Sequence, residues 1–179
     1  MMTCFVAFLR GINVGGRTVK KEILHKMFAS LGFQNVTTFK QSGNVIFESK
    51  STNAEEIKAK IEDKLNNALG YNVAVFIRTM PQLKNIIEQN PFKGQEKEGT
   101  SYLVTMLPNG SSTVPLQLPV TIPKSTAQIS SANSAEVFSE THGGGEGALP
   151  NPFIESKLKM KTTTRNLNII REIVEKYST

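Results

Sequence analysis

The sequence predicts an α+β protein whose N-terminal part is a ferredoxin-like unit with the order β-α-β-β-α-β. Three observations lead to this prediction: a strand that is apolar on both faces, two amphipathic helical segments, and a hairpin between them. The 179 residues are 39% hydrophobic and 20% charged, which is typical of a folded globular chain. We therefore expect a ferredoxin-like unit over residues 1–79, joined to a second, smaller α+β half over residues 80–179.

The first strand and the first helix follow from the spacing of apolar residues. Both alternating faces of residues 4–9 are apolar, as in a strand that is buried on both sides. The glycine-rich segment Arg10–Arg17 interrupts this strand. Residues 20–31 then repeat apolar side chains at helical spacing. The expected apolar face of this helix consists of Ile23, Leu24, Met27, Phe28 and Leu31.

A hairpin and a second helix complete the N-terminal unit. Two short strands over residues 35–40 and 45–49 flank the turn residues Gln41–Asn44. The second helix runs between the N-cap Asn53 and the terminator Gly70. A fourth strand covers residues 73–78.

The C-terminal half has weaker patterns. We expect helices over residues 81–89, 152–158 and 165–177, and strands over residues 101–107, 128–131 and 135–141. Four prolines make residues 108–123 extended rather than helical. The segment Gly143–Gly147 is expected to be a flexible turn, and Thr163 or Thr164 is expected to cap the last helix.

Three motifs, in this order, make the chain resemble a known family. They are LRGINVGG at Leu9–Gly16, QSGNVIF at Gln41–Phe47 and TTRNLN at Thr163–Asn168. The sequence is similar to the mostly bacterial domain-of-unknown-function family numbered 1697. The resemblance implies an α+β fold and supplies no activity. The chain departs from the family at Leu167, where a tryptophan is usual; leucine is a tolerable replacement if that position only packs in the core.

Charge is distributed unevenly along the chain. The net charge is +6, made up of +5 over residues 1–50, −3 over residues 51–156 and +4 over residues 157–179. If the two basic ends meet, they favour an anionic partner such as a phosphate, a nucleotide or a nucleic acid. The alternative is a solvated basic surface that keeps the protein soluble.

Composition also indicates where in the cell the protein resides and which cofactors it can bind. No apolar run is long enough to span a bilayer, and the start of the chain lacks the features of a signal peptide. The one cysteine, Cys4, cannot form an internal disulfide, and no cysteine and histidine cluster has metal-ligand spacing. We therefore expect a cytoplasmic protein with no membrane partner, no metal and no cofactor. The oligomeric state is not indicated.

Topology predicts a site at one end of the N-terminal sheet. In a β-α-β-β-α-β unit, the loop after the first strand and the hairpin after the second strand lie at the same end. Glycines can direct backbone N–H groups at an oxyanion, and arginine and lysine add charge. The candidate ligand-binding residues are Arg10, Gly11, Asn13, Gly15, Gly16, Arg17, Lys20, Gln41, Ser42 and Asn44. The alternative is a purely structural loop and hairpin, in which Asn13 bonds its own backbone.

The C-terminal motif predicts a second group of ligand-binding residues. Thr164, Arg165 and Asn166 are expected at the start of the last helix, where N–H groups and a guanidinium favour phosphate. The alternative is plain capping of that helix. Whether this segment meets the glycine-rich loop does not follow from the sequence.

Three classes of function remain open at this point. The first is a protein that binds an anionic, phosphate-bearing ligand at the glycine-rich end of the sheet. The second is an enzyme that acts on a small phosphorylated or carboxylated metabolite, although no nucleophile or general base is evident. The third is a protein-interaction module that uses an uncovered sheet edge or the proline-rich residues 108–123.

Overall fold

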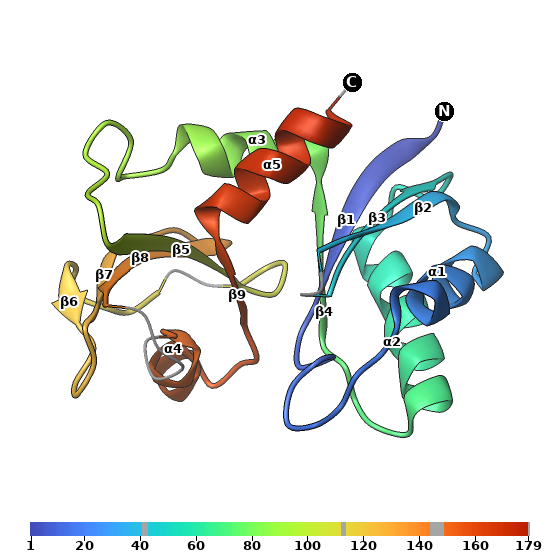
Figure 1. The fold of residues 1–179 in the computed structure, drawn as a ribbon, viewed down its shortest axis with the longest axis horizontal. Helices are drawn as coiled ribbons and strands as arrows, with labels where there is room; N and C mark the ends of the chain where they lie inside the picture. Colours follow the sequence, from blue (N-terminus) through green and yellow to red (C-terminus); the bar gives the residue numbers. More distant parts are fainter. Residues whose placement is uncertain (41–42, 112–113, 144–148, 179) are drawn as a thin grey trace. The chain divides into compact units, whose positions relative to one another are not determined.

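Two antiparallel sheets, one in each half, organise the chain (Figure 1). The computed structural model describes residues 1–40, 43–111, 114–143 and 149–178. Two compact units, residues 1–82 and 83–179, make up an α+β fold with two halves, as predicted. Within the described residues, every helix is too short or too polar to cross a membrane.

The first unit has the predicted ferredoxin-like topology. Its elements are β1 (Thr3–Leu9), α1 (Lys21–Ser30), β2 (Gln34–Phe39), β3 (Asn44–Ser49), α2 (Ala54–Leu69) and β4 (Val75–Thr79). The strands pair antiparallel in the order β2-β3-β1-β4, so that β2 is one edge of the sheet. The long central strand β1 is buried on both faces from Phe5 to Leu9, as its double apolar pattern predicts.

Both helices of this unit cover the same face of the sheet (Figure 1). The core between these helices and the sheet contains a cluster of aromatic rings. The centroid of the Phe47 ring lies 4.5 Å from that of Phe33, 5.4 Å from that of Phe28 and 5.9 Å from that of Phe5. One prediction for α1 is wrong. Ile23 is 42% exposed, because the face that α1 buries is centred on Leu24 and Phe28.

Helix α2 begins and ends where the sequence predicts. The side chain of Asn53 accepts hydrogen bonds of 3.2 Å from the amides of Glu55 and Glu56. At the other end Gly70 adopts a left-handed conformation with φ of 75°. Local sequence therefore defines this helix at both ends.

The second unit contains a five-stranded sheet. Its elements are most of α3 (Met80–Glu88), which begins at the end of the first unit, and then β5 (Thr100–Met106), β6 (Val120–Thr121), β7 (Ala127–Ala132), β8 (Glu136–His142), α4 (Asn151–Leu158), β9 (Thr163–Asn166) and α5 (Leu167–Tyr177). The strand order is β6-β7-β8-β5-β9. Figure 1 shows α3 and α5 on one side of this sheet and α4 on the other. The pairing of β7 with β8 confirms the predicted C-terminal strand pair.

The predicted start of the last helix is wrong. Residues Thr163–Asn166 form strand β9, which pairs antiparallel with β5. Helix α5 begins only at Leu167, and its N-cap is Asn166, whose side chain accepts a hydrogen bond of 2.9 Å from the Asn168 amide. Leu167 is 1% exposed, which favours a packing role for this position.

Other expectations for the C-terminal half have mixed outcomes. The described part of residues 108–123 contains the two-residue strand β6 and no helix, in agreement with the proline pattern. Most of the expected flexible turn, residues 144–147, lies outside the described residues.

Candidate ligand-binding site

The glycine-rich loop and the hairpin meet at one end of the first sheet. The Leu9 amide donates a hydrogen bond of 2.8 Å to the Gly43 carbonyl oxygen. Gly43 has a φ of +69°, and a Cβ atom there would lie 2.7 Å from Cγ2 of Ile12. Only glycine allows this close approach. The structure thus confirms the prediction that the two segments lie together.

The loop is closed by its own groups. The Val19 amide donates a hydrogen bond of 2.8 Å to Oδ1 of Asn13. The Arg17 amide donates to the Val14 carbonyl oxygen at 3.1 Å. The three glycines of the loop all have positive φ, at 69° for Gly11, 61° for Gly15 and 79° for Gly16. These contacts give the loop a defined conformation up to the start of α1.

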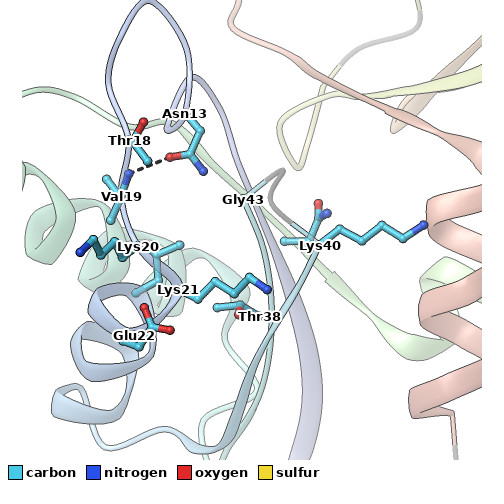
Figure 2. Close-up of a pocket in the computed structure, with 11 residues that line it drawn as sticks. Asn13, Thr18, Val19, Lys20, Lys21, Glu22, Thr38, Lys40 and Gly43 are labelled. Carbon is cyan, nitrogen blue, oxygen red and sulfur yellow. Dashed lines mark hydrogen bonds between the residues drawn. The ribbon is translucent and has the colours of Figure 1, made fainter.

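A pocket of about 490 Å³ lies beside this loop, and we call it the lysine pocket. Its lining comes from the end of the loop, the first turn of α1, the end of β2 and the hairpin (Figure 2). The lining residues are Asn13, Thr18, Val19, Lys20, Lys21, Glu22, Leu24, Thr38, Lys40, Gly43 and Asn44. The lysine pocket therefore belongs wholly to the first unit.

The lysine pocket has a positive lining. Three lysines, Lys20, Lys21 and Lys40, and one carboxylate, Glu22, are its charged side chains. All four are exposed, and Figure 2 shows Lys21 extending toward Thr38, Lys20 extending the opposite way and Lys40 extending away from both. Lysine is a flexible point charge, so these ammonium groups can turn toward a bound anion.

The start of α1 also opens on the lysine pocket. Lys20 is the N-cap residue, with φ of −65° and ψ of 147°, and no side chain caps the helix. The first N–H groups of a helix have no partner within the helix, and they carry the positive end of its dipole. The arrangement of N–H groups and lysines suits a negatively charged group.

Three of the predicted site residues line this pocket: Asn13, Lys20 and Asn44. Asn44 is 1% exposed, and its side-chain nitrogen donates to the Phe39 carbonyl oxygen at 3.2 Å. Asn13 closes the loop through the Val19 amide rather than by bonding its own backbone, and it also lines the pocket. Gln41 and Ser42 lie outside the described residues.

The other loop residues that the sequence predicts to bind a ligand are not part of the pocket lining. They are Arg10, Gly11, Gly15, Gly16 and Arg17. The Arg17 guanidinium carbon lies 4.2 Å from the centroid of the Tyr71 ring, in a cation–π contact. The Arg10 amide donates to the Ala74 carbonyl oxygen at 2.9 Å, and burial lowers the pKa of its guanidinium. Both arginines thus have contacts within the fold of the first unit.

Five polar residues of the pocket were missed: Thr18, Lys21, Glu22, Thr38 and Lys40. They stand next to the recognised motifs rather than inside them. Two features of the sequence predict part of this set: the basic pair Lys20 and Lys21 at the start of a helix, and Lys40 directly before the hairpin.

The C-terminal candidates form a separate group in the second unit. The hydroxyls of Thr164 and Thr105 lie 2.7 Å apart across the β9–β5 pair. The Arg165 guanidinium donates to Oγ1 of Thr163 at 2.8 Å and to the Thr164 carbonyl oxygen at 2.9 Å. Burial lowers the pKa of Arg165 to about 10. These groups bond within the sheet, and a role for Thr164, Arg165 and Asn166 in ligand binding stays a prediction.

Comparison with known proteins gives one family and one fold. The chain superposes on the conserved bacterial protein SP0830 from Streptococcus pneumoniae with a TM-score of 0.70. The two share 18% sequence identity, and the alignment covers 98% of each chain, so the similarity concerns the fold. No curated protein sequence matches the chain. The sequence profile of the family described as "Protein of unknown function (DUF1697)" matches residues 2–137, which include the glycine-rich loop and the hairpin. The chain therefore belongs to the DUF1697 family.

Proposed function

We propose that the first unit binds an anionic, phosphate-bearing ligand in the lysine pocket. The observation that carries this proposal is that Lys20, Lys21 and Lys40 all line one pocket at the start of a helix that no side chain caps. With Glu22 as the one carboxylate in the lining, these side chains leave two net positive charges. A phosphate monoester carries about two negative charges at neutral pH, which matches this charge.

Neutral groups in the same pocket supply orientation. Thr18 and Thr38 line it from opposite sides, one from the loop before α1 and one from β2 (Figure 2). Threonine hydroxyls and backbone N–H groups donate hydrogen bonds to phosphate oxygens without adding charge. We expect the lysines to supply affinity and these donors to fix the direction of the phosphate.

The size of the pocket extends the proposal beyond inorganic phosphate. A volume of about 490 Å³ falls within the range of about 300–1,000 Å³ that is typical of small-molecule sites. The pocket therefore has room for an organic group beside the phosphate. A nucleotide is the ligand class that fits both the charge and the volume.

The ionisable lining favours binding over catalysis. Its members are three lysines and one glutamate, and all are exposed. General acid–base catalysis normally uses a group that is held in an enclosed site against the reacting atoms. We therefore propose a binding protein, with recognition rather than turnover at this pocket.

Titration calorimetry with inorganic phosphate, pyrophosphate, AMP and ATP tests the proposal. The double substitution Lys20→Ala and Lys21→Ala should weaken binding of the phosphate compounds about tenfold or more, because it removes charged donors to the anion. Lys50→Ala is the matched control, since Lys50 is an exposed lysine after β3, at the other end of the same sheet. Binding that is equal in both variants, or no binding of any phosphate compound, would refute the proposal.

A further inference from the structure

A second hollow adjoins the lysine pocket. It has a volume of about 530 Å³ and is lined by Lys21, Glu22, His25, Lys26, Val36, Thr37 and Thr38. Lys21, Glu22 and Thr38 line both hollows, so the two are neighbours along the same side of α1. We call the two together the α1–β2 groove, because one wall is α1 and the other is β2.

The α1 wall carries two lysines, Lys21 and Lys26, and one carboxylate, Glu22, so its net charge is positive. His25 and Lys26 follow Lys21 and Glu22 by four residues each, so all four lie on neighbouring positions of one helix face. Lys21 and Lys26 are five residues apart, about 7.5 Å along the helix axis. This distance is on the scale of one nucleotide in an extended strand. The groove thus has a second cationic position beyond the lysine pocket.

The β2 wall offers hydrogen-bonding groups. Because β2 is an edge of the sheet, one row of its backbone N–H and C=O groups points away from β3. Thr37 and Thr38 add hydroxyls, while Val36 beside them is buried in the core at 9% exposed. Across from them, the exposed His25 presents a planar ring of the kind on which nucleic-acid bases stack.

We infer that the α1–β2 groove binds a nucleotide chain of at least two phosphodiester-linked nucleotides. This inference rests on the proposed function, since one phosphate occupies the lysine pocket and the next lies along Lys26. The base between them stacks on His25 and bonds to β2. An acidic peptide would also contact the lysines, but it has no base to stack on the His25 ring.

Fluorescence anisotropy with labelled single-stranded DNA tests this inference. The probes are a mononucleotide, a 5′-phosphorylated dinucleotide, a tetranucleotide and an octanucleotide, each at two salt concentrations. The dinucleotide should bind several-fold more tightly than the mononucleotide. Its salt dependence should be steeper by about 0.7 in the slope of log K against log salt, as for one added phosphate contact on a single strand.

Substitution of Lys26 separates this inference from the proposed function. Lys26→Ala should remove the gain of the dinucleotide and leave the mononucleotide unchanged, because Lys26 lines only the second hollow. Lys50→Ala should leave both unchanged. If the mononucleotide binds but the dinucleotide gains nothing, the inference fails and the proposed function stands. If no probe binds, both fail.

The longer oligonucleotides and a peptide competitor distinguish a free dinucleotide from a nucleic-acid strand and from an acidic protein partner. Affinity that stops rising at two nucleotides would support a free dinucleotide, and affinity that rises to the octamer would support a strand of nucleic acid. A hexaglutamate peptide that competes as well as the dinucleotide, with the same dependence on Lys26, would overturn the inference in favour of an acidic protein partner.

Discussion

The side-chain oxygen of Asn13 accepts a hydrogen bond of 2.8 Å from the amide of Val19, six residues later in the chain. This bond spans the glycine-rich loop and fixes its end at the start of α1. Val19 is 8% exposed, so its N–H group would have little access to water without this partner. Asn13 also lines the lysine pocket, so the bond connects the loop to the proposed binding site.

Two substitutions of Asn13 should separate its structural effect from its effect on the ligand. Asn13→Ala leaves the Val19 amide unpaired, and we expect a loss of about 1–3 kcal/mol in the free energy of unfolding. Asn13→Asp keeps the acceptor oxygen and most of the stability, but its negative charge in the pocket should weaken phosphate binding. Urea unfolding and calorimetry measure the two effects. Equal stability of the Ala variant and the native protein would contradict this prediction.

Gly43→Ala should destabilise the first unit strongly. The residue has a φ of +69°, and an added Cβ would lie 2.7 Å from Cγ2 of Ile12 and 3.1 Å from the Leu9 carbonyl oxygen. Left-handed backbone costs a non-glycine residue about 1–2 kcal/mol, and overpacking adds about 1–3 kcal/mol. Gly16→Ala is the control, since its φ is +79° but no atom lies within 4 Å of the new Cβ. Thermal unfolding should show the larger loss for Gly43; equal losses would mean that the contact with Ile12 relaxes freely.

Arg17 should contribute to stability and not to the lysine pocket. Its guanidinium lies over the Tyr71 ring at 4.2 Å, and such exposed cation–π contacts contribute about 0.5–1 kcal/mol. Arg17→Ala should therefore lower stability by about that amount and leave phosphate affinity nearly unchanged. Arg17→Lys should restore part of the loss, because an ammonium also binds a ring face. A large loss of phosphate affinity in Arg17→Ala would instead place Arg17 in the site.

Glu22→Gln should increase the affinity of the lysine pocket for phosphate. Glu22 supplies the one carboxylate of the pocket lining, and its charge opposes a bound anion. Glutamine has nearly the same shape, so the fold should be unchanged. The gain should be largest at low salt and should shrink as salt screens the charge. Calorimetry at two ionic strengths measures it. An affinity that falls would show that Glu22 bonds to the ligand directly.

Cys4 should make stability depend on pH in the alkaline range. Burial raises the pKa of the Cys4 thiol above its ordinary value of 9.0, and the Glu48 carboxylate opposite it on β3 raises it further. The folded protein therefore keeps a proton that the unfolded chain releases. This contribution is complete below pH 9 and is lost as the pH rises through the raised pKa of the folded protein. Urea unfolding from pH 7 to pH 10.5 should show a steeper decline for the native protein than for Cys4→Ala. Parallel declines would contradict this prediction.

The N-terminal unit could be predicted from sequence because its signals are local. The doubly apolar β1, the N-cap Asn53 and the terminator Gly70 each define an element without help from distant residues. The ferredoxin-like order then places the loop and the hairpin at one end, and the Leu9–Gly43 hydrogen bond shows that they meet there.

Strand β9 could not be predicted in this way. Thr163 and Thr164 are acceptable N-caps as well as good strand residues, so local propensity allows both structures. The choice is made by pairing with β5, about sixty residues earlier in the chain, where Thr164 lies opposite Thr105. Asn166 then takes the capping role that the sequence assigned to a threonine.

The lysine pocket was only partly predictable for a related reason. Asn13, Lys20 and Asn44 belong to recognisable motifs, and they were among the candidates. Lys21 and Lys40 stand beside the motifs rather than inside them, and only the packing of α1 against β2 brings them to one pocket. Arg17 seemed suited to phosphate, but the sequence does not show that Tyr71 lies beneath it.

The bond between the Leu9 amide and the Gly43 carbonyl has a consequence for the speed of ligand exchange. It joins the exit of β1 to the hairpin, so the floor of the lysine pocket at Gly43 and Asn44 is held in place before any ligand arrives. The rim, in contrast, consists of lysine side chains that reorient within nanoseconds. If the pocket binds an anion as proposed, we expect no slow backbone rearrangement before binding, and we expect the association rate to depend on diffusion and on the attraction between the lysines and the anion. Differences between ligands would therefore lie mainly in how long each one stays.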